Sequence, residues 1–253
     1  MLPPLIKSTF KRRRARALPK AIAMHEYDIL VFQEAFHHRA RQILRKQLKE
    51  KYPFQYGPAN RRVMSLKTNS GVWVLSKFPL KLLGTVKYTD CQGVDCWGRK
   101  GAVLLEGQWQ GQTFQLLGTH LESGPQEVRN MQYPEIRGLI DRHKKAGVPQ
   151  LLCGDFNTNK SDKVSFEGMM KTLDAEDGEL INKAITLDGT MDDFKQRGPA
   201  ETGSTIIDFI FYRGNGHQGA TIEREARQFE YPWHKSYKGL ADHNAVEMRI
   251  KFK

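Results

Sequence analysis

Seven short apolar runs, each bounded by turn residues, constrain the fold of this chain more than any other feature. Each run is too short for a typical helix, and several alternate apolar with polar residues, so we expect strands. Helical patterns separate only some of the runs, which predicts an α/β fold with helices outside packed sheets. The expected strands are YDILVFQ (27–33), GVWVLSK (71–77), KGAVLLEG (100–107), QTFQLLGTH (112–120), PQLLCGD (149–155), TIIDFIFY (205–212) and AVEMRIKF (245–252).

Three segments between the runs have helical patterns. The first is residues 17–25, with Pro19 expected in the first turn, and the second is residues 39–52. The third is residues 126–147, which we expect to stop at Gly147 and to be kinked or divided by Pro134. We find no internal repeat, low-complexity tract or linker, so we expect residues 1–253 to form a single catalytic domain.

Acidic, amide and histidine side chains follow several of the runs directly. A carboxylate at a strand end is more often a turn or cap residue, so each one alone is a weak signal. Together they supply what metal-assisted phosphate hydrolysis requires, namely hard oxygen ligands, a base for water and donors for phosphoryl oxygens. The residues are Glu34, His120, Asp155, Asn157, Asp208, Asp242 and His243.

The order of these motifs resembles the endonuclease/exonuclease/phosphatase superfamily. QE (33–34), GTHL (118–121), GDFN (154–157), an Asp-aromatic-Ile strand (208–210) and ADH (241–243) match its motifs in chain order. LPP (2–4), DCWGRKG (95–101) and VRNMQ (128–132) are similar to the bacterial-type neutral sphingomyelinase branch. The resemblance implies a four-layered α/β sandwich of the DNase I type, with two packed mixed β-sheets flanked by helices.

The resemblance also implies a metal cofactor and its ligands. Glu34 matches the family's principal Mg²⁺ carboxylate, and Asp242 is expected near the same ion, with Mn²⁺ or Co²⁺ as substitutes. The competing reading of Glu34 is an N-cap for the helix that follows.

Five residues are expected to be catalytic by the same resemblance. His243 is the general base, and Asp208 would hold its imidazole in the correct tautomer. His120 would touch the scissile phosphate and protonate or stabilise the leaving oxygen. Asp155 would orient water or metal, and Asn157 would hold a phosphoryl oxygen. The alternatives are a core histidine at position 120 and an Asx-turn for GDFN.

Three further residues are expected to bind substrate. Asp95 and Lys100 match a sphingomyelinase segment near the active site, where Lys100 would offset phosphate charge; a solvated turn is the alternative. Trp233 lies with Phe229 and Tyr231 in a segment that meets lipid in the sphingomyelinase branch. Packing under the preceding strand is the other interpretation of these rings.

The resemblance leads us to expect an Mg²⁺-dependent phosphodiesterase that cleaves a phospholipid such as sphingomyelin to ceramide and phosphocholine, as a monomer at a membrane surface. The net charge of +12 suits anionic surfaces but equally suits nucleic acid. A nuclease or DNA-end-processing phosphodiesterase of the same fold is therefore the first alternative. A catalytically silent lipid- or nucleic-acid-binding module is the second.

The start of the chain and its cysteines bear on compartment. The family's first strand, with its metal-site Asn, would precede LPP, and the sequence as given starts there. Three explanations are open: the first residue of the sequence is set too late, the strand is removed by cleavage, or the protein functions without it. No signal peptide is visible, but a truncated start would allow a secreted or periplasmic protein. Cys153 is expected as a buried thiol, whereas Cys91 and Cys96 are either reduced or bridged in an oxidising compartment.

Overall fold

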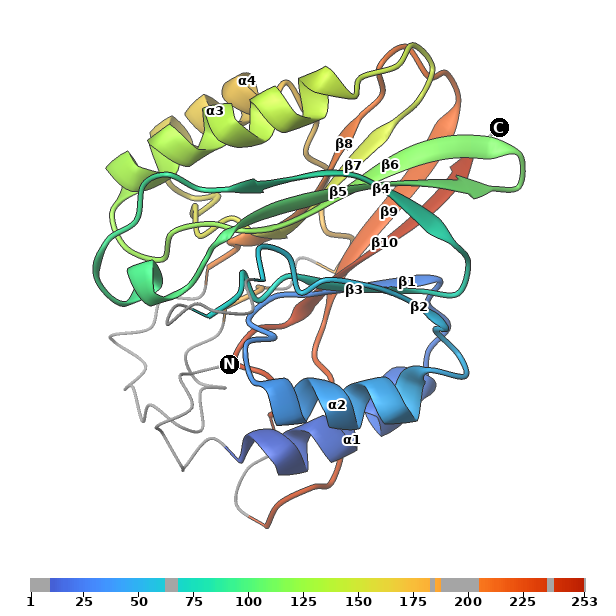
Figure 1. Ribbon diagram of the computed structural model, residues 1–253. Coiled ribbons are helices and arrows are strands. Elements are labelled where there is room, and N and C mark those ends of the chain that lie inside the picture. Colours follow the sequence, from blue (N-terminus) through green and yellow to red (C-terminus); the bar gives the residue numbers. More distant parts are fainter. Residues whose placement is uncertain (1–9, 62–67, 183–184, 188–204, 236–238, 253) are drawn as a thin grey trace.

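The computed structural model describes residues 10–61, 68–182, 185–187, 205–235 and 239–252. These residues form four layers, in which two layers of strands pack face to face and helices cover the outer side of each (Figure 1). The expected four-layered α/β sandwich is therefore confirmed.

The larger sheet is mixed and holds five strands in the order β4-β5-β6-β7-β8. Its neighbours are antiparallel except for β6 and β7, which are parallel because a helix crosses over between them. The strands are β4 (Leu80–Lys87), β5 (Gly101–Trp109), β6 (Gln112–His120), β7 (Gln150–Asp155) and β8 (Asp208–Arg213).

The second strand layer is made of two antiparallel pieces in the part of the chain that is described. One has the order β1-β3-β2, and the other pairs β9 with β10. Their bounds are β1 (Ile29–Phe32), β2 (Phe54–Tyr56), β3 (Trp73–Ser76), β9 (Ala220–Arg227) and β10 (Ala245–Phe252). All seven expected strands are confirmed, whereas β2, β4 and β9 were not expected. The family's first strand would precede LPP (2–4), so the described ranges do not test whether the native protein has it.

Among the described residues, four α-helices form the outer layers: α1 (Lys11–Ala23), α2 (His38–Leu48), α3 (Gln126–Arg142) and α4 (Lys163–Leu173). The expected place of Pro19 in a first turn is wrong, since α1 begins at Lys11. Residues 11–17 are Lys, Arg and Ala, which favour helix strongly enough to start it earlier. Pro134 does not divide α3, and Gly147 is not its stop, because the helix ends at Arg142. Helix α4 was not predicted.

Alternating side chains of the larger sheet fill two separate cores. Ala102 and Leu104 of β5 face α3 and α4, whereas Val103 and Leu105 face the second strand layer. This period of two is what a strand buried on both faces requires. A third core lies between β3 and the helices α1 and α2, around Leu44. Burial on both faces fixes the strand register, and with it the positions of the residues at the strand ends.

No helix in the described ranges is both long and apolar enough to cross a bilayer.

Candidate functional site

Three neighbouring strands bring three candidate residues into one row. In the pairing register, His120 at the end of β6 is the Cα partner of Asp155 at the end of β7, and Asp155 is the partner of Asp208 at the start of β8. Gly154 precedes Asp155 and lies so close to β6 that a Cβ would come within 2.3 Å of the Thr119 carbonyl oxygen. Any larger residue there would separate the strands that align this row.

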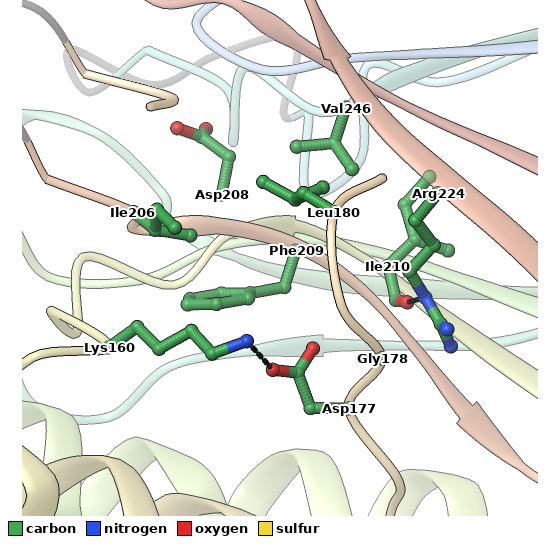
Figure 2. A pocket seen from close by; sticks show the side chains of 10 residues that line it. All are labelled: Lys160, Asp177, Gly178, Leu180, Ile206, Asp208, Phe209, Ile210, Arg224 and Val246. Carbon is green, nitrogen blue, oxygen red and sulfur yellow. Dashed lines mark hydrogen bonds and ion pairs between the residues drawn. The ribbon is translucent and has the colours of Figure 1, made fainter. Parts of the chain in front are cut away.

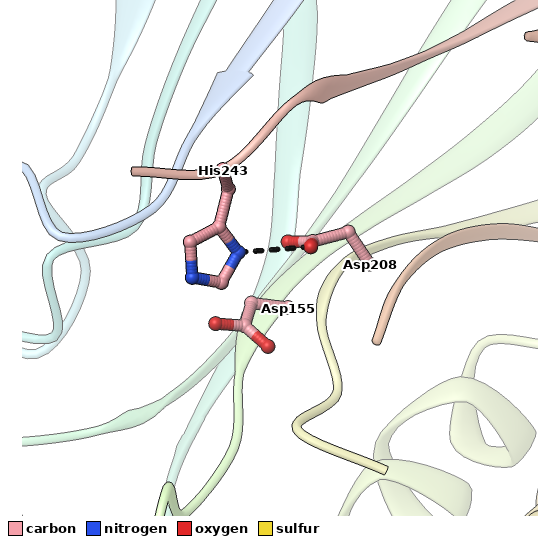
Figure 3. Close-up of side chains that lie close together, drawn as sticks. All are labelled: Asp155, Asp208 and His243. Carbon is pink, nitrogen blue, oxygen red and sulfur yellow. Dashed lines mark hydrogen bonds and ion pairs between the residues drawn. The ribbon is translucent and has the colours of Figure 1, made fainter. Parts of the chain in front are cut away.

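His243 reaches the row from the segment before β10. Its Nδ1 lies 2.9 Å from Asp208 Oδ2, and Figure 3 shows the imidazole beside the Asp208 carboxylate and above Asp155. One ligand atom from each of the three residues falls within 4.8 Å of the others. Burial lowers the pKa of His243, but the charges of Asp208, Asp155 and Asp242 outweigh it and raise the pKa to about 10.

The carboxylates of this cluster fit a divalent cation. Burial, followed by the charge of Asp208, raises the pKa of Asp155 to about 7. Two carboxylates and an imidazole held this close carry negative charge that a cation would offset, and oxygen and imidazole donors suit divalent ions. A possible metal-binding group is therefore present.

Glu34 and Asp242, the ligands expected from the sequence, lie outside this cluster of three. Glu34 follows β1 with a positive φ of 51°, a conformation that non-glycine residues rarely adopt. Gly71 leaves room for it, because a Cβ at Gly71 would come within 3.0 Å of the Glu34 Cα. Asp242 precedes His243 and helps to raise its pKa. Their role as metal ligands stays a prediction.

Lys100 holds His120 on the other side of the row. Its Nζ donates to Asp95 Oδ2 at 2.7 Å and to the Leu121 carbonyl at 2.7 Å, and it lies 3.0 Å from His120 Nε2. An ammonium has three N–H donors and no acceptor, so Nε2 must accept and the imidazole proton is on Nδ1. His120 Nδ1 is buried and has no hydrogen-bond partner among the described residues.

His120 is neutral in this environment. Burial, and then the Lys100 ammonium, hold the pKa of His120 well below its usual range. The 3.5 Å separation of His120 Nε2 and Asp155 Oδ2 is therefore no ion pair. A neutral imidazole with an unused Nδ1–H is suited to donate to a phosphoryl or leaving oxygen.

Asn157 fits both interpretations of GDFN. Its backbone N–H donates to Asp155 Oδ1 at 2.9 Å, which is the Asx-turn, and its φ of 51° suits an Asn. Its side-chain Nδ2 donates to the Leu121 carbonyl at 3.0 Å. The turn thus leaves the other Asp155 oxygen, and one N–H of the Asn157 amide, for the site.

Trp233 does not join the cluster. Its ring makes an edge contact with Phe10, and Phe229, Tyr231 and Trp233 pack around Ala17 of α1 and its apolar neighbours. This packing is against a helix and not under the preceding strand. A substrate contact for Trp233 stays a prediction that no contact in the described residues supports.

Sequence reasoning missed the residue that positions the Asp208–His243 pair. The Thr186 hydroxyl accepts from the backbone N–H groups of Ile207 and Asp208, and the Thr186 carbonyl accepts from Asn244 N–H at 2.7 Å. Thr186 is fully buried. Its segment has no strand or helix pattern, so no signal in the sequence marked it.

A small hollow lies behind Asp208. Leu180, Phe209 and Ile210 line part of it, and the ion pair between Lys160 and Asp177 at 2.6 Å lies at its edge (Figure 2). Its apolar lining supports the back of β8 and offers no further ligand for the cluster.

The fold and the clustered carboxylates and imidazoles define the class of this protein, and the comparisons agree. The model of the Endonuclease/Exonuclease/phosphatase family matches residues 8–225, so the chain belongs to that family. It is 27% identical to Sphingomyelinase C 2 of Leptospira interrogans over 78% of the chain, which spans only 35% of that protein.

Solved structures share the fold. β toxin 275-280 from Staphylococcus aureus has a TM-score of 0.84 at 20% identity, covering 94% of this chain and 92% of that one. A β toxin mutant with bound magnesium ions has a TM-score of 0.75 at 19% identity, covering 94% and 91%. Truncated TDP2 from Caenorhabditis elegans has a TM-score of 0.70 at 18% identity, covering 98% and 94%.

Proposed function

We propose that this chain is a divalent-metal-dependent phosphodiesterase whose substrate is a phospholipid of the sphingomyelin type, cleaved to ceramide and phosphocholine. The observation that carries the proposal is the Asp208–His243 pair beside Asp155, with the neutral His120 in the same row. Membership of the family supports the reaction class. The likeness to Sphingomyelinase C 2 supports the lipid substrate.

In this mechanism the protein residues move protons and orient the ester. Asp208 accepts the Nδ1–H of His243, and once the pKa of His243 falls from about 10 to below the working pH, the deprotonated Nε2 takes a proton from water. The water oxygen attacks phosphorus and the bond to the lipid oxygen breaks. His120 Nδ1–H hydrogen-bonds to the leaving oxygen, and the Asn157 amide donates to a phosphoryl oxygen. The leaving oxygen takes its proton from solvent, and His243 releases to solvent the proton that it accepted. The products are an alcohol and a phosphomonoester.

Glu34 and Asp242 would hold the cation, which we propose to be Mg²⁺, with Asp155 beside it. When bound, a divalent cation polarises the ester oxygens and offsets the negative charge that raises the pKa of His243. Asp208 Oδ2 and His243 Nδ1 already bond to each other, so we assign these two residues to proton transfer and not to the cation. Residues 1–253 as one domain, and a monomer, belong to the same proposal.

A nucleic-acid phosphodiester is the second candidate substrate. The net charge of +12 favours it, and the likeness in fold to TDP2 lends it weight. The exposed cations of α1 and α2 suit a phosphate backbone as well as a lipid surface. A silent binding module would have the same charges but no turnover.

One experiment separates these functions. The purified chain is assayed on sphingomyelin vesicles, a nicked DNA duplex and bis(p-nitrophenyl) phosphate, each with Mg²⁺ and with EDTA. We expect Mg²⁺-dependent release of phosphocholine and no nicking. Hydrolysis that persists in EDTA would contradict metal dependence, and turnover of DNA alone would establish the nuclease.

Variants then test the site. We expect His243→Ala to lower kcat by about 10²- to 10⁴-fold, because it removes the base. Glu34→Gln should instead weaken Mn²⁺ binding, measured by calorimetry. Circular dichroism should be unchanged in both, since both side chains are partly exposed. Near wild-type turnover by His243→Ala would remove the assignment.

A further inference from the structure

The short 3-10 turn η2 (Gly93–Trp97) carries two apolar side chains into solvent. Val94 is 76% exposed and Trp97 is 70% exposed. The chain has four tryptophans, and the other three are more buried: Trp73 is 3% exposed, Trp109 is 36% exposed and Trp233 is partly buried. An indole that is this exposed would gain free energy if it were buried. The turn therefore presents an apolar surface that a partner could cover.

The turn is held rigidly. A disulfide joins Cys91 to Cys96, and the Trp97 carbonyl accepts from Thr68 N–H at 2.9 Å. Gln92 N–H donates to Glu122 Oε2 at 3.1 Å, which ties the turn to the end of β6. A ring on a rigid turn loses little conformational entropy when it is buried by a partner.

The turn lies at the rim of the candidate site. Between the two exposed residues, Asp95 points inward and accepts from Lys100 Nζ and from Ser123 N–H, each at 2.7 Å. Lys100 Nζ is in turn 3.0 Å from His120 Nε2. Figure 1 shows the turn at the end of the sandwich where α3 begins. Val94 and Trp97 therefore flank a residue that is linked to His120 through a single side chain, that of Lys100.

We propose that Val94 and Trp97 are an interfacial anchor that enters the headgroup region of a phospholipid bilayer beside the catalytic site. This rests on the proposed lipid phosphodiesterase function. Indole prefers the boundary between headgroups and acyl chains, and the adjoining valine adds apolar contact. The anchor would set the height of the site above the bilayer, so that a headgroup phosphate reaches His120 without leaving the membrane.

Two other occupants fit the turn less well. Base stacking would use the Trp97 ring but gives no role to Val94. A second copy of the chain would need about 800 Å² of buried surface on each partner, far more than two side chains provide. The bilayer is the occupant that uses both residues and needs no larger patch.

The test uses the full chain with Trp97→Ala, Val94→Ser and the double variant. Met24→Ala is the matched control, because Met24 is an apolar side chain that is 71% exposed and directly follows α1, outside the turn η2. Flotation with phosphatidylcholine and sphingomyelin vesicles, in EDTA, measures binding without catalysis. We expect the double variant to bind about tenfold more weakly and to hydrolyse vesicles about tenfold more slowly. Hydrolysis of bis(p-nitrophenyl) phosphate should be unchanged, as should every property of the control.

Fluorescence gives a second readout. Since Trp97 is the most exposed indole, vesicles should shift the emission of the wild type to the blue, and Trp97→Phe should lose that shift while keeping most of the binding. Equal loss on vesicles and on the soluble diester would overturn the proposal, as would unchanged flotation of the double variant. Weakened binding of a single-stranded oligonucleotide with vesicle binding intact would assign the ring to base stacking. A wild type that floats but hydrolyses nothing would sink the proposed function and leave the anchor standing.

Discussion

Lys100 contributes to the site by holding other groups in place. Its three N–H donors are directed to Asp95, the Leu121 carbonyl and His120 Nε2, so in this arrangement none is left for substrate. Lys100 can then offset the charge of a phosphate only through the electrostatic field of its ammonium group, without a direct hydrogen bond to the substrate. Its direct effect is on His120, where it places the imidazole proton on Nδ1.

Asp208→Asn should shift the pH profile. The Asp208 carboxylate raises the pKa of His243, and an amide carries no charge to do so. The acid limb of kcat against pH, which reports deprotonation of the base, should therefore move to lower pH, and kcat should fall because the imidazole loses its acceptor. A pH series on bis(p-nitrophenyl) phosphate measures this. An acid limb that stays in place, or moves to higher pH, would contradict the pairing.

Two elements carry functional groups at the surface of the molecule. The disulfide turn η2 is joined to the end of β6 by hydrogen bonds from Ser123 and Lys100 to Asp95. The helices α1 and α2 have no acidic residue, and four of their exposed cations, Arg12, Arg16, Arg39 and Lys46, line a shallow groove with Gln42 and Ile43. Each element leads to a prediction.

Removing the disulfide with Cys91→Ser and Cys96→Ser should lower activity more than stability. A disulfide that closes a loop this short stabilises the folded protein by about 2 kcal/mol, because it lowers the entropy of the unfolded chain. Release of the turn loosens Asp95 and so misplaces Lys100 and His120, and a small misplacement can cost about tenfold or more in kcat. Thermal unfolding and kcat on the soluble diester measure both effects. Cys153→Ala, which removes the buried free thiol, is the control, and unchanged kcat in the double variant would refute the prediction.

Neutralising the helix groove should weaken binding to anionic vesicles. Each Lys or Arg near an anionic surface contributes about 1 kcal/mol, so Arg12→Gln with Arg39→Gln should reduce binding by about tenfold or more. Salt should have the same effect, because the Debye length falls to about 8 Å at physiological ionic strength. Lys171→Gln removes a charge from the opposite outer layer and is the control. Equal effects of the groove and control variants would show that only net charge matters.

At the scale of the whole molecule, the charges of the site should make stability depend on pH. In the metal-free protein, Asp155 has a pKa of about 7 and His243 one of about 10, both above their ordinary values. Groups whose folded pKa is raised give stability that is present below the unfolded pKa and lost as pH rises towards the folded pKa. Both residues therefore make the metal-free fold less stable at pH 8 than at pH 5.

Mg²⁺ should restore that stability at the higher pH. At about 100 times its Kd, a ligand adds about 2.7 kcal/mol, which raises Tm by about 5 to 10 °C for a chain of this size. At pH 5 protons compete for the same carboxylates, so the rise should be less than half as large. Differential scanning calorimetry at both pH values, with Asp155→Asn as control, measures it. An equal rise at both pH values would contradict the place of Asp155 beside the cation.

The sequence alone determined the local features of this protein. A strand with apolar residues on both faces, such as β5 or β7, has its pattern in its own residues, and the motifs at strand ends retain their chain order. Strands such as β4 and β9 were missed because they are half exposed and exist through pairing with a neighbour, which no local pattern records.

The tertiary structure decided the contacts between distant residues. Asp208 and His243 are 35 positions apart, and Arg14 donates to the Leu240 carbonyl across 226 positions. The packing of Trp233 against α1 and the exposure of Trp97 depend on which layers meet, because burial is a property of neighbours in space. Sequence can therefore name the chemical groups of the site, whereas their distances, tautomers and charges follow only from the folded layers.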